Sequence, residues 1–184
     1  MKPKVVIQNV VATARLKHRI DLNAIVRKFP NVDYRPETFP GLPFKLDKPK
    51  SCILIFSSGS MVCTGTKSEK EARRAVMKVL RELRKAGIIV ASRPEITIQN
   101  IVASVELGEV TIDLEEAVHK LRAMYEPEQF PGVIHRMEDP KCVFLLFSTG
   151  KLVCVGAKRE VDVYKAVENV VAMLEESSLI IKKA

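Results

Sequence analysis

The chain has 184 residues, of which 47% are hydrophobic and 28% are charged, and its formal net charge at pH 7 is +8. This composition is typical of a globular protein and excludes a disordered or collagen-like chain. No apolar run approaches the roughly 18 residues of a membrane span, and the N-terminus lacks the apolar segment of a signal peptide. We therefore expect a cytoplasmic protein with no membrane partner.

The charge is unevenly divided along the chain. Residues 1–92 carry 19 Lys and Arg against 7 Asp and Glu, a net charge of +12, whereas residues 93–184 carry 11 against 15, a net charge of −4. A basic excess favours a polyanionic partner. The acidic second half favours a second partner that is itself basic.

The first predicted strand runs from Val5 to Thr13, and a similar strand is predicted from Ile96 to Val105. The pentads QNVVA and QNIVA inside these strands differ at one position. A polar Asn lowers the strand propensity of an apolar segment. Its recurrence as Asn9 and Asn100 therefore indicates a function, although each Asn could instead satisfy a neighbouring loop.

A short helix is predicted after each of these strands, with Asp21 and Asp113 as N-caps. A long helix capped by Ser68 follows later, and its counterpart near the end of the chain has no Ser cap. The apolar stripes of the two long helices are expected at Ala72, Ala75, Val76, Val79, Leu80 and Leu83, and at Val163, Ala166, Val167, Val170, Val171 and Leu174.

Between the short and long helices, both halves contain a strand, a tight turn and a second strand, at Lys50–Lys67 and Lys141–Lys158. The segments Tyr34–Lys67 and Tyr125–Lys158 are identical at 16 of 34 positions. This is a duplication, and it predicts two repeats, 1–92 and 93–184, related by a pseudo-twofold axis. The predicted fold class is α+β, with about ten antiparallel strands and four helices on one face of the sheet.

Four helices cover one face of such a sheet, and the other face is also apolar and nearly free of charge. Its predicted residues are Asn9, Val11, Leu54, Phe56, Val62 and Thr64, and Asn100, Val102, Leu145, Phe147, Val153 and Val155. The cations expected around it are Lys45, Lys50, Lys67, Arg136, Lys141, Lys151 and Lys158. An apolar floor with a basic rim suits a nucleic-acid groove, because phosphates meet the rim while sugars and base edges meet the floor. Phe39 and Phe130 precede Pro-Gly turns and could join Phe56 and Phe147 as wedges between base steps.

The doubled motifs Q-N-[VI]-V-A, E-x-F-P-G, P-K-x-x-x-L-[IL]-F-x-[ST]-G and V-C-x-G-x-K closely resemble the TATA-binding protein family in its compact, archaeal type. The resemblance covers essentially the whole chain. It implies a curved, saddle-shaped sheet on the DNA minor groove, with the helices on the convex face. It also implies insertion of the four phenylalanines, and hydrogen bonds from Asn9 and Asn100 to minor-groove acceptors.

The resemblance further implies a general transcription initiation factor that binds double-stranded promoter DNA and recruits a transcription factor B-type protein, and RNA polymerase indirectly. The docking loop is expected to include Glu126, Glu128 and Gln129. In the first repeat Arg35 stands where Glu126 stands in the second. A basic partner would therefore distinguish the two repeats.

Three departures from the family pattern are expected to change affinity or site preference, or to mark a paralogue. Val155 stands where the family usually has Thr, and Ser60 stands where it often has Lys. The unusual segment Leu42-Pro43-Phe44 calls the strand pairing after Phe39 into question.

No catalytic or metal site is predicted. The four cysteines form no C-x-x-C pair, and Cys63 and Cys154 are expected to be buried, reduced thiols. The three histidines are scattered, and Glu37 and Glu128 recur without a metal-ligating neighbour. We therefore expect no cofactor and no enzymatic activity. The alternatives are a DNA-processing enzyme or accessory domain with a similar sheet, and a carrier of apolar ligands. In the absence of DNA, weak homodimerisation through the apolar face is also possible.

Overall fold

The computed structural model describes residues 1–184, and they form two compact units. One unit contains Asn9–Gln99, and the other contains Met1–Gln8 together with Asn100–Ala184. The strands β1 (Lys4–Arg15) and β5 (Glu95–Glu106) each begin in one unit and end in the other. Compact units and sequence repeats are therefore not the same divisions of the chain. The boundaries of the two repeats, 1–92 and 93–184, therefore stay a prediction from the duplicated sequence.

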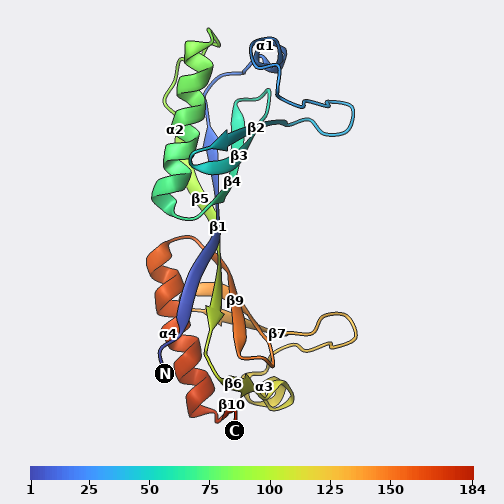
Figure 1. Ribbon diagram of the computed structural model, residues 1–184, viewed down its shortest axis with the longest axis vertical. Helices are drawn as coiled ribbons and strands as arrows, with labels where there is room; N and C mark the ends of the chain where they lie inside the picture. The colour runs from blue at the N-terminus through green and yellow to red at the C-terminus, as the bar shows by residue number, and fades with distance from the viewer. The chain divides into compact units, whose positions relative to one another are not determined.

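Ten strands and four helices make up the fold, as predicted (Figure 1). The remaining elements are α1 (Leu22–Lys28), β2 (Leu42–Asp47), β3 (Lys50–Ile55), β4 (Ser60–Thr66), α2 (Glu69–Lys85), β6 (Val110–Ile112), α3 (Leu114–Leu121), β7 (Val133–Glu138), β8 (Lys141–Leu146), β9 (Lys151–Ala157), α4 (Glu160–Glu176) and β10 (Ile180–Lys182).

Eight of the strands belong to a large antiparallel sheet. The order is β2-β3-β4-β1-β5 in the Asn9–Gln99 unit and β1-β5-β9-β8-β7 in the other unit. The short strands β6 and β10 pair separately in a two-stranded sheet. Neither was predicted individually, because three residues are too few for a periodic pattern.

The long helices α2 and α4 bury the apolar stripes expected of them. All twelve stripe residues are buried. Ser68 accepts the N–H of Glu71 at 3.0 Å and caps α2, whereas Arg159, which precedes α4, forms no side-chain cap, as predicted. In the short helices Asp21 and Asp113 cap α1 and α3 by accepting N–H groups at 3.2 and 3.1 Å. Local capping chemistry therefore sets the helix starts.

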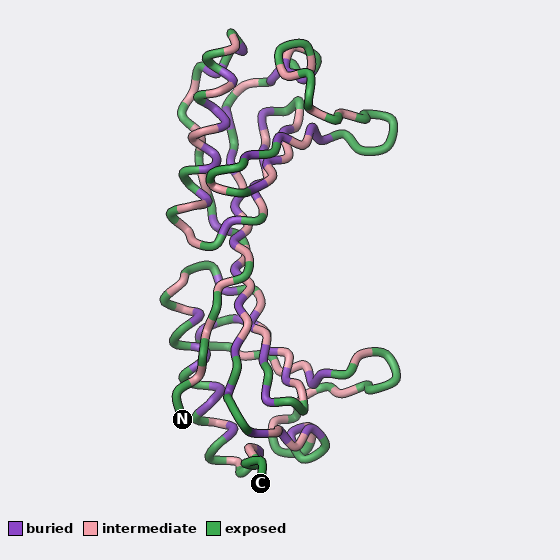
Figure 2. The backbone as a smooth tube through the Cα atoms, viewed as in Figure 1, coloured by how far each residue is buried: buried purple, intermediate pink, exposed green.

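Burial alternates along the strands and defines two faces of each sheet. In β3 the side chains of Ile53 and Ile55 are fully buried on the side that α2 covers, whereas Leu54 is only half-buried. In β8 Phe144 and Leu146 are fully buried, and Leu145 is half-buried. We call the half-buried side the open face. Figure 2 shows this alternation as purple and pink bands along the strands.

The strand pairing after Phe39 is intact. The register of β2 with β3 runs without interruption from Leu42↔Ile55 to Asp47↔Lys50, including Pro43. Pro43 is tolerated because β2 is an edge strand, on which a missing N–H need not break the sheet. On the outer side of β2, Pro43 lines a cavity.

None of the helices combines the length and apolarity needed to span a bilayer. The thiols of Cys63 and Cys154 are free and fully buried, as predicted. Burial raises the pKa of Cys63 to about 11, so this thiol stays protonated. No group of three or more His, Cys, Asp or Glu side chains could hold a metal ion.

Candidate nucleic-acid interface

All twelve residues predicted for the apolar face lie on the open face of their units, and all are half-buried. Cross-strand neighbours join them, because Leu54 is opposite Val62 and Leu145 is opposite Val153. Each unit therefore presents one continuous apolar surface to solvent. A half-exposed apolar sheet face of this kind indicates a binding surface.

Four further residues lie on this face. Val143 shares it with Leu145 and Phe147, as alternation along Lys141–Lys158 predicts, whereas Cys52, Thr13 and Ser104 were missed in the sequence. Cys52 and Val143 lie opposite Thr64 and Val155. Thr13 accepts a hydrogen bond from Gln99 at 2.9 Å, and Ser104 accepts one from Gln8 at 2.9 Å. The period of two along each strand could have identified these three as well, because each is two residues from a predicted position.

The repeated asparagines are held in one orientation. The amide oxygen of Asn9 accepts the backbone N–H of Gly65 at 2.7 Å, and that of Asn100 accepts the N–H of Gly156 at 2.7 Å. A backbone N–H requires an acceptor, so the oxygen must face the glycine and the amide NH2 must point elsewhere. Neither NH2 has a partner within the chain, so each remains a donor on the open face.

Glycine makes this orientation possible because it occupies a β-bulge. The pairing of β1 with β4 shifts register between Val10 and Ala12, and the pairing of β5 with β9 shifts between Ile101 and Val102. Gly65 and Gly156 have φ values of +94° and +100°, a conformation that residues with a Cβ rarely adopt. The bulge turns the glycine N–H out of the ladder and towards the asparagine.

The four predicted wedge phenylalanines form two pairs. The rings of Phe39 and Phe56 meet edge to face with centroids 6.0 Å apart, and those of Phe130 and Phe147 do so at 5.7 Å. Phe39 is 45% exposed, which is unusual for so large an apolar side chain. In each unit a loop phenylalanine therefore packs against a phenylalanine of the strand-turn segment.

The Pro-Gly that follows each loop phenylalanine has a packing reason. A Cβ on Gly41 would lie 2.6 Å from a ring carbon of Phe39, and one on Gly132 would lie 2.8 Å from a ring carbon of Phe130. Real Cβ atoms do not approach so closely. The glycines therefore allow each ring to fold back over the backbone and reach its partner.

The loops that carry Phe39 and Phe130 have the same turn in both units. Backbone N–H groups of Thr38 and Phe39 donate to Arg35, and those of Gln129 and Phe130 donate to Glu126, at 2.9 to 3.1 Å. Both loops are largely exposed, including the predicted partner-binding residues, and they extend beyond their sheets (Figures 1 and 2). The same backbone geometry therefore displays opposite charges at Arg35 and Glu126.

Six of the seven predicted phosphate contacts gather at two equivalent cavities beside the open face. Lys45, Lys50 and Lys67 line a cavity of about 800 Å³ next to Thr64. Arg136, Lys141 and Lys158 line one of about 560 Å³ next to Val155. The seventh, Lys151, lies apart at the start of β9, opposite Glu106. Two carboxylates also line each cavity, Asp47 and Glu71 in the first and Glu138 and Asp162 in the second, so three cations leave each lining with an excess of one positive charge.

The sequence profile described as "Transcription factor TFIID (or TATA-binding protein, TBP)" matches residues 4–86 and 95–177. The chain belongs to the TATA-binding protein family. A TATA-box-binding protein of Pyrodictium occultum is 52% identical over 176 residues, covering 95% of this chain and 88% of the relative. That of Aeropyrum pernix is 49% identical over 181 residues, covering 98% and 89%.

The solved structure described as "Methanococcus jannaschii TBP" matches with a TM-score of 0.83 and 42% identity, covering 94% of this chain and 99% of that one. These matches confirm the resemblance inferred from the doubled motifs. As a member of the TATA-binding protein family, the chain is a DNA-binding transcription factor and not an enzyme, so the enzymatic alternative is discarded.

Proposed function

We propose that this member of the TATA-binding protein family is a general initiation factor that binds the minor groove of A·T-rich promoter DNA through its open face. The observation that carries the proposal is the fixed amide of Asn9 and its equivalent Asn100. Each offers an NH2 donor from an apolar surface. The minor-groove edges of A·T pairs present only acceptors, whereas G·C pairs add a donor that would oppose this NH2.

The two phenylalanine pairs supply the wedges for DNA bending. Apolar side chains inserted between base steps unstack them and bend the duplex away from the protein, a mode of which the TATA-binding proteins are the type example. The cation clusters at the two cavities hold the phosphates on either side. In the first unit the wedge and the cation cluster lie at opposite ends of one strand pair, because Phe56 follows the Leu42↔Ile55 end of β2 and β3 whereas Lys50 is at the other end. The second unit repeats this arrangement with Phe147 and Lys141.

Recruitment follows from the loop that carries Glu126, Glu128 and Gln129. Its exposed carboxylates suit a basic surface, and a transcription factor B-type protein docked there brings in RNA polymerase. We expect the factor to work at the nucleoid. Without DNA, the exposed apolar faces favour weak self-association.

A gel-shift titration comparing an A·T-rich duplex with a G·C-rich duplex of equal length tests the proposal. We expect at least about tenfold tighter binding to the A·T-rich duplex, with affinity that falls steeply as salt rises. Equal affinity for the two duplexes would mean that the protein is held only by non-specific attraction to phosphates. That result would overturn the proposed preference for A·T-rich DNA.

A further inference from the structure

The first repeat has an open outer edge where the second repeat is closed. In the second repeat Met124 and Ile134 exchange two backbone hydrogen bonds, at 3.1 and 2.8 Å, which tie the preceding segment to β7. The equivalent residues in the first repeat are Asp33 and Pro43. Proline has no N–H to donate, and no backbone hydrogen bond joins these two residues.

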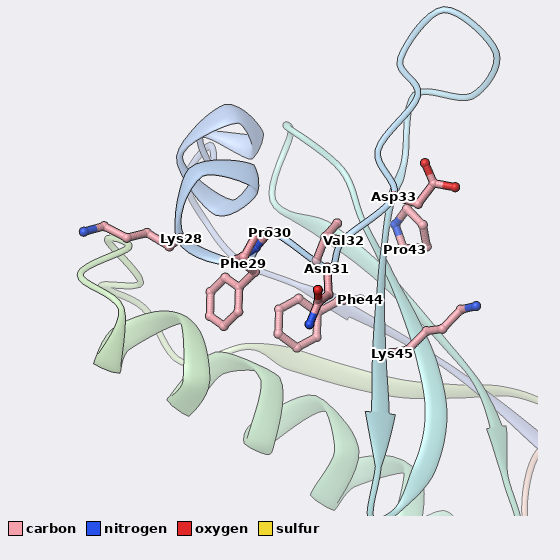
Figure 3. A pocket seen from close by; sticks show the side chains of 9 residues that line it. All are labelled: Lys28, Phe29, Pro30, Asn31, Val32, Asp33, Pro43, Phe44 and Lys45. Atoms are coloured by element: carbon pink, nitrogen blue, oxygen red, sulfur yellow. The ribbon is translucent and has the colours of Figure 1, made fainter.

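A cavity of about 510 Å³ lies at this open edge (Figure 3). Its lining comes from the end of α1, the segment that follows it, and β2: Lys28, Phe29, Pro30, Asn31, Val32, Asp33, Pro43, Phe44 and Lys45. The rings of Phe29 and Phe44 pack edge to face with centroids 5.0 Å apart. In the second repeat His135 replaces Phe44, so this aromatic pair exists in the first repeat alone.

The rim of the cavity is positively charged. Lys28 and Lys45 are exposed, and their side chains extend on opposite sides of the aromatic pair in Figure 3. Asp33, the one carboxylate in the lining, forms an exposed ion pair with Arg35 at 3.0 Å. The two lysines therefore outnumber the carboxylates of the lining by one.

We propose that this cavity binds an acidic segment of a partner protein, which inserts one large apolar side chain between Phe29 and Val32 and places carboxylates on the lysines. The apolar walls accept an aromatic or large aliphatic anchor, the kind of side chain that dominates interface energies. The net charge of +12 on residues 1–92 attracts an acidic segment over a longer range. This site shares Lys45 with the first cation cluster, but Lys28, Phe29 and Val32 take no part in the DNA proposal.

The probe is a short synthetic peptide with one central Trp flanked by Glu residues. Because this protein contains no Trp, the peptide fluorescence reports only on the peptide. We expect a saturable blue shift as the indole leaves water, at peptide concentrations below about 1 mM in low salt. A second peptide, with Ala in place of Trp, should compete poorly with the first. That result would show that binding requires the apolar anchor.

Two surface variants test the site without touching the DNA interface. Lys28→Glu reverses a rim charge, and Val32→Glu places a carboxylate in the cavity. Each should therefore lower the affinity for the peptide by about tenfold or more. Lys70→Glu, an exposed position at the start of α2, is the matched control for the change in net charge and should weaken it by less than about twofold. Circular dichroism verifies that all three variants are folded.

Three outcomes would overturn the proposal. If the peptide gives no saturable fluorescence shift, an acidic segment with an apolar anchor is excluded as the occupant of the cavity. Equal weakening by Lys70→Glu would reduce the effect to general attraction to a basic repeat. Concentration-dependent dimerisation that Lys28→Glu abolishes would show that the cavity receives the acidic half of a second copy of the chain instead.

Discussion

The amide oxygen of Asn9 lies 2.7 Å from the backbone nitrogen of Gly65 and accepts its N–H, and Asn100 and Gly156 repeat this contact. One side chain thus accepts a hydrogen bond at the bulge through its oxygen and leaves its nitrogen as a donor on the open face. The alternative considered from the sequence was that each Asn satisfies a neighbouring loop, but the N–H groups that it accepts belong to Gly65 within β4 and Gly156 within β9. The NH2 of each amide has no partner within the chain.

Asn9→Asp separates the two roles. A carboxylate still accepts the Gly65 N–H but has no NH2, so the melting temperature should stay close to that of the wild type while A·T-rich binding falls by about tenfold or more. Asn9→Ala should lower both the melting temperature and the affinity for the A·T-rich duplex. Gln8→Glu, on the neighbouring residue, controls for the added negative charge. Unchanged DNA affinity in Asn9→Asp would remove this amide from the proposed base contacts.

Gly132→Ala should disturb the second wedge without unfolding the protein. The new Cβ would lie 2.8 Å from a ring carbon of Phe130 and 3.1 Å from one of Phe147, so the packing of this pair must shift. We expect reduced bending by fluorescence energy transfer between the DNA ends, with a smaller loss than in Phe147→Ala. Both variants retain the basic clusters and should still bind DNA at low salt. If DNA bound by Phe147→Ala is bent as much as by the wild type, Phe147 is not a wedge.

Val155→Thr should tighten binding to an A·T-rich site. Thr64 occupies the equivalent position beside the first cation cavity, and Val155 lies beside the second. A hydroxyl that reaches a minor-groove acceptor adds about 0.5–1.5 kcal/mol. Isothermal titration calorimetry measures the change, with Thr64→Val as the reciprocal variant. Equal or weaker binding by Val155→Thr would show that the valine is suited to its own contact.

Replacing both Glu126 and Glu128 by Arg should abolish recruitment of a transcription factor B-type protein to the protein–DNA complex. Both carboxylates are exposed on a loop whose backbone hydrogen bonds do not involve them. Binary DNA binding should persist, and wild-type recruitment should weaken with salt. Native gels with DNA, protein and factor distinguish these steps. Normal recruitment by the double variant would place the docking site elsewhere.

His135→Phe should make stability less dependent on pH. Burial lowers the pKa of His135 below its ordinary value of 6.5, so the unfolded chain takes up this proton at higher pH than the folded chain does. The free energy of unfolding should therefore decrease as pH falls below 6.5, and this decrease should be smaller in the variant. Urea titrations at several pH values measure it, with the exposed His119→Asn as control. The same pH dependence in His135→Phe and wild type would contradict the prediction.

Much of the fold could be predicted because its signals are local and occur twice. The stripes of α2 and α4, the caps at Asp21 and Asp113, and the alternation along the strands all depend on neighbours within a few residues. The short strands β6 and β10 could not be predicted, because only their pairing with each other stabilises them. Pro43 was expected to threaten the pairing of β2, yet its place on an edge strand makes it harmless there.

The candidate interface likewise has features that the sequence predicts and features that only the structure provides. By itself the sequence determined that an apolar face carrying Asn9 and Asn100 exists twice, because period-two alternation and duplication are both readable along the chain. Only the tertiary structure decided which end of each amide is free, why Gly41 and Gly132 follow the loop phenylalanines, and that Lys151 is separate from the other cations. It also decided that Pro43 lines a cavity at the outer edge of the first repeat. These features depend on contacts between residues far apart in the chain, and a linear pattern does not encode which of them meet.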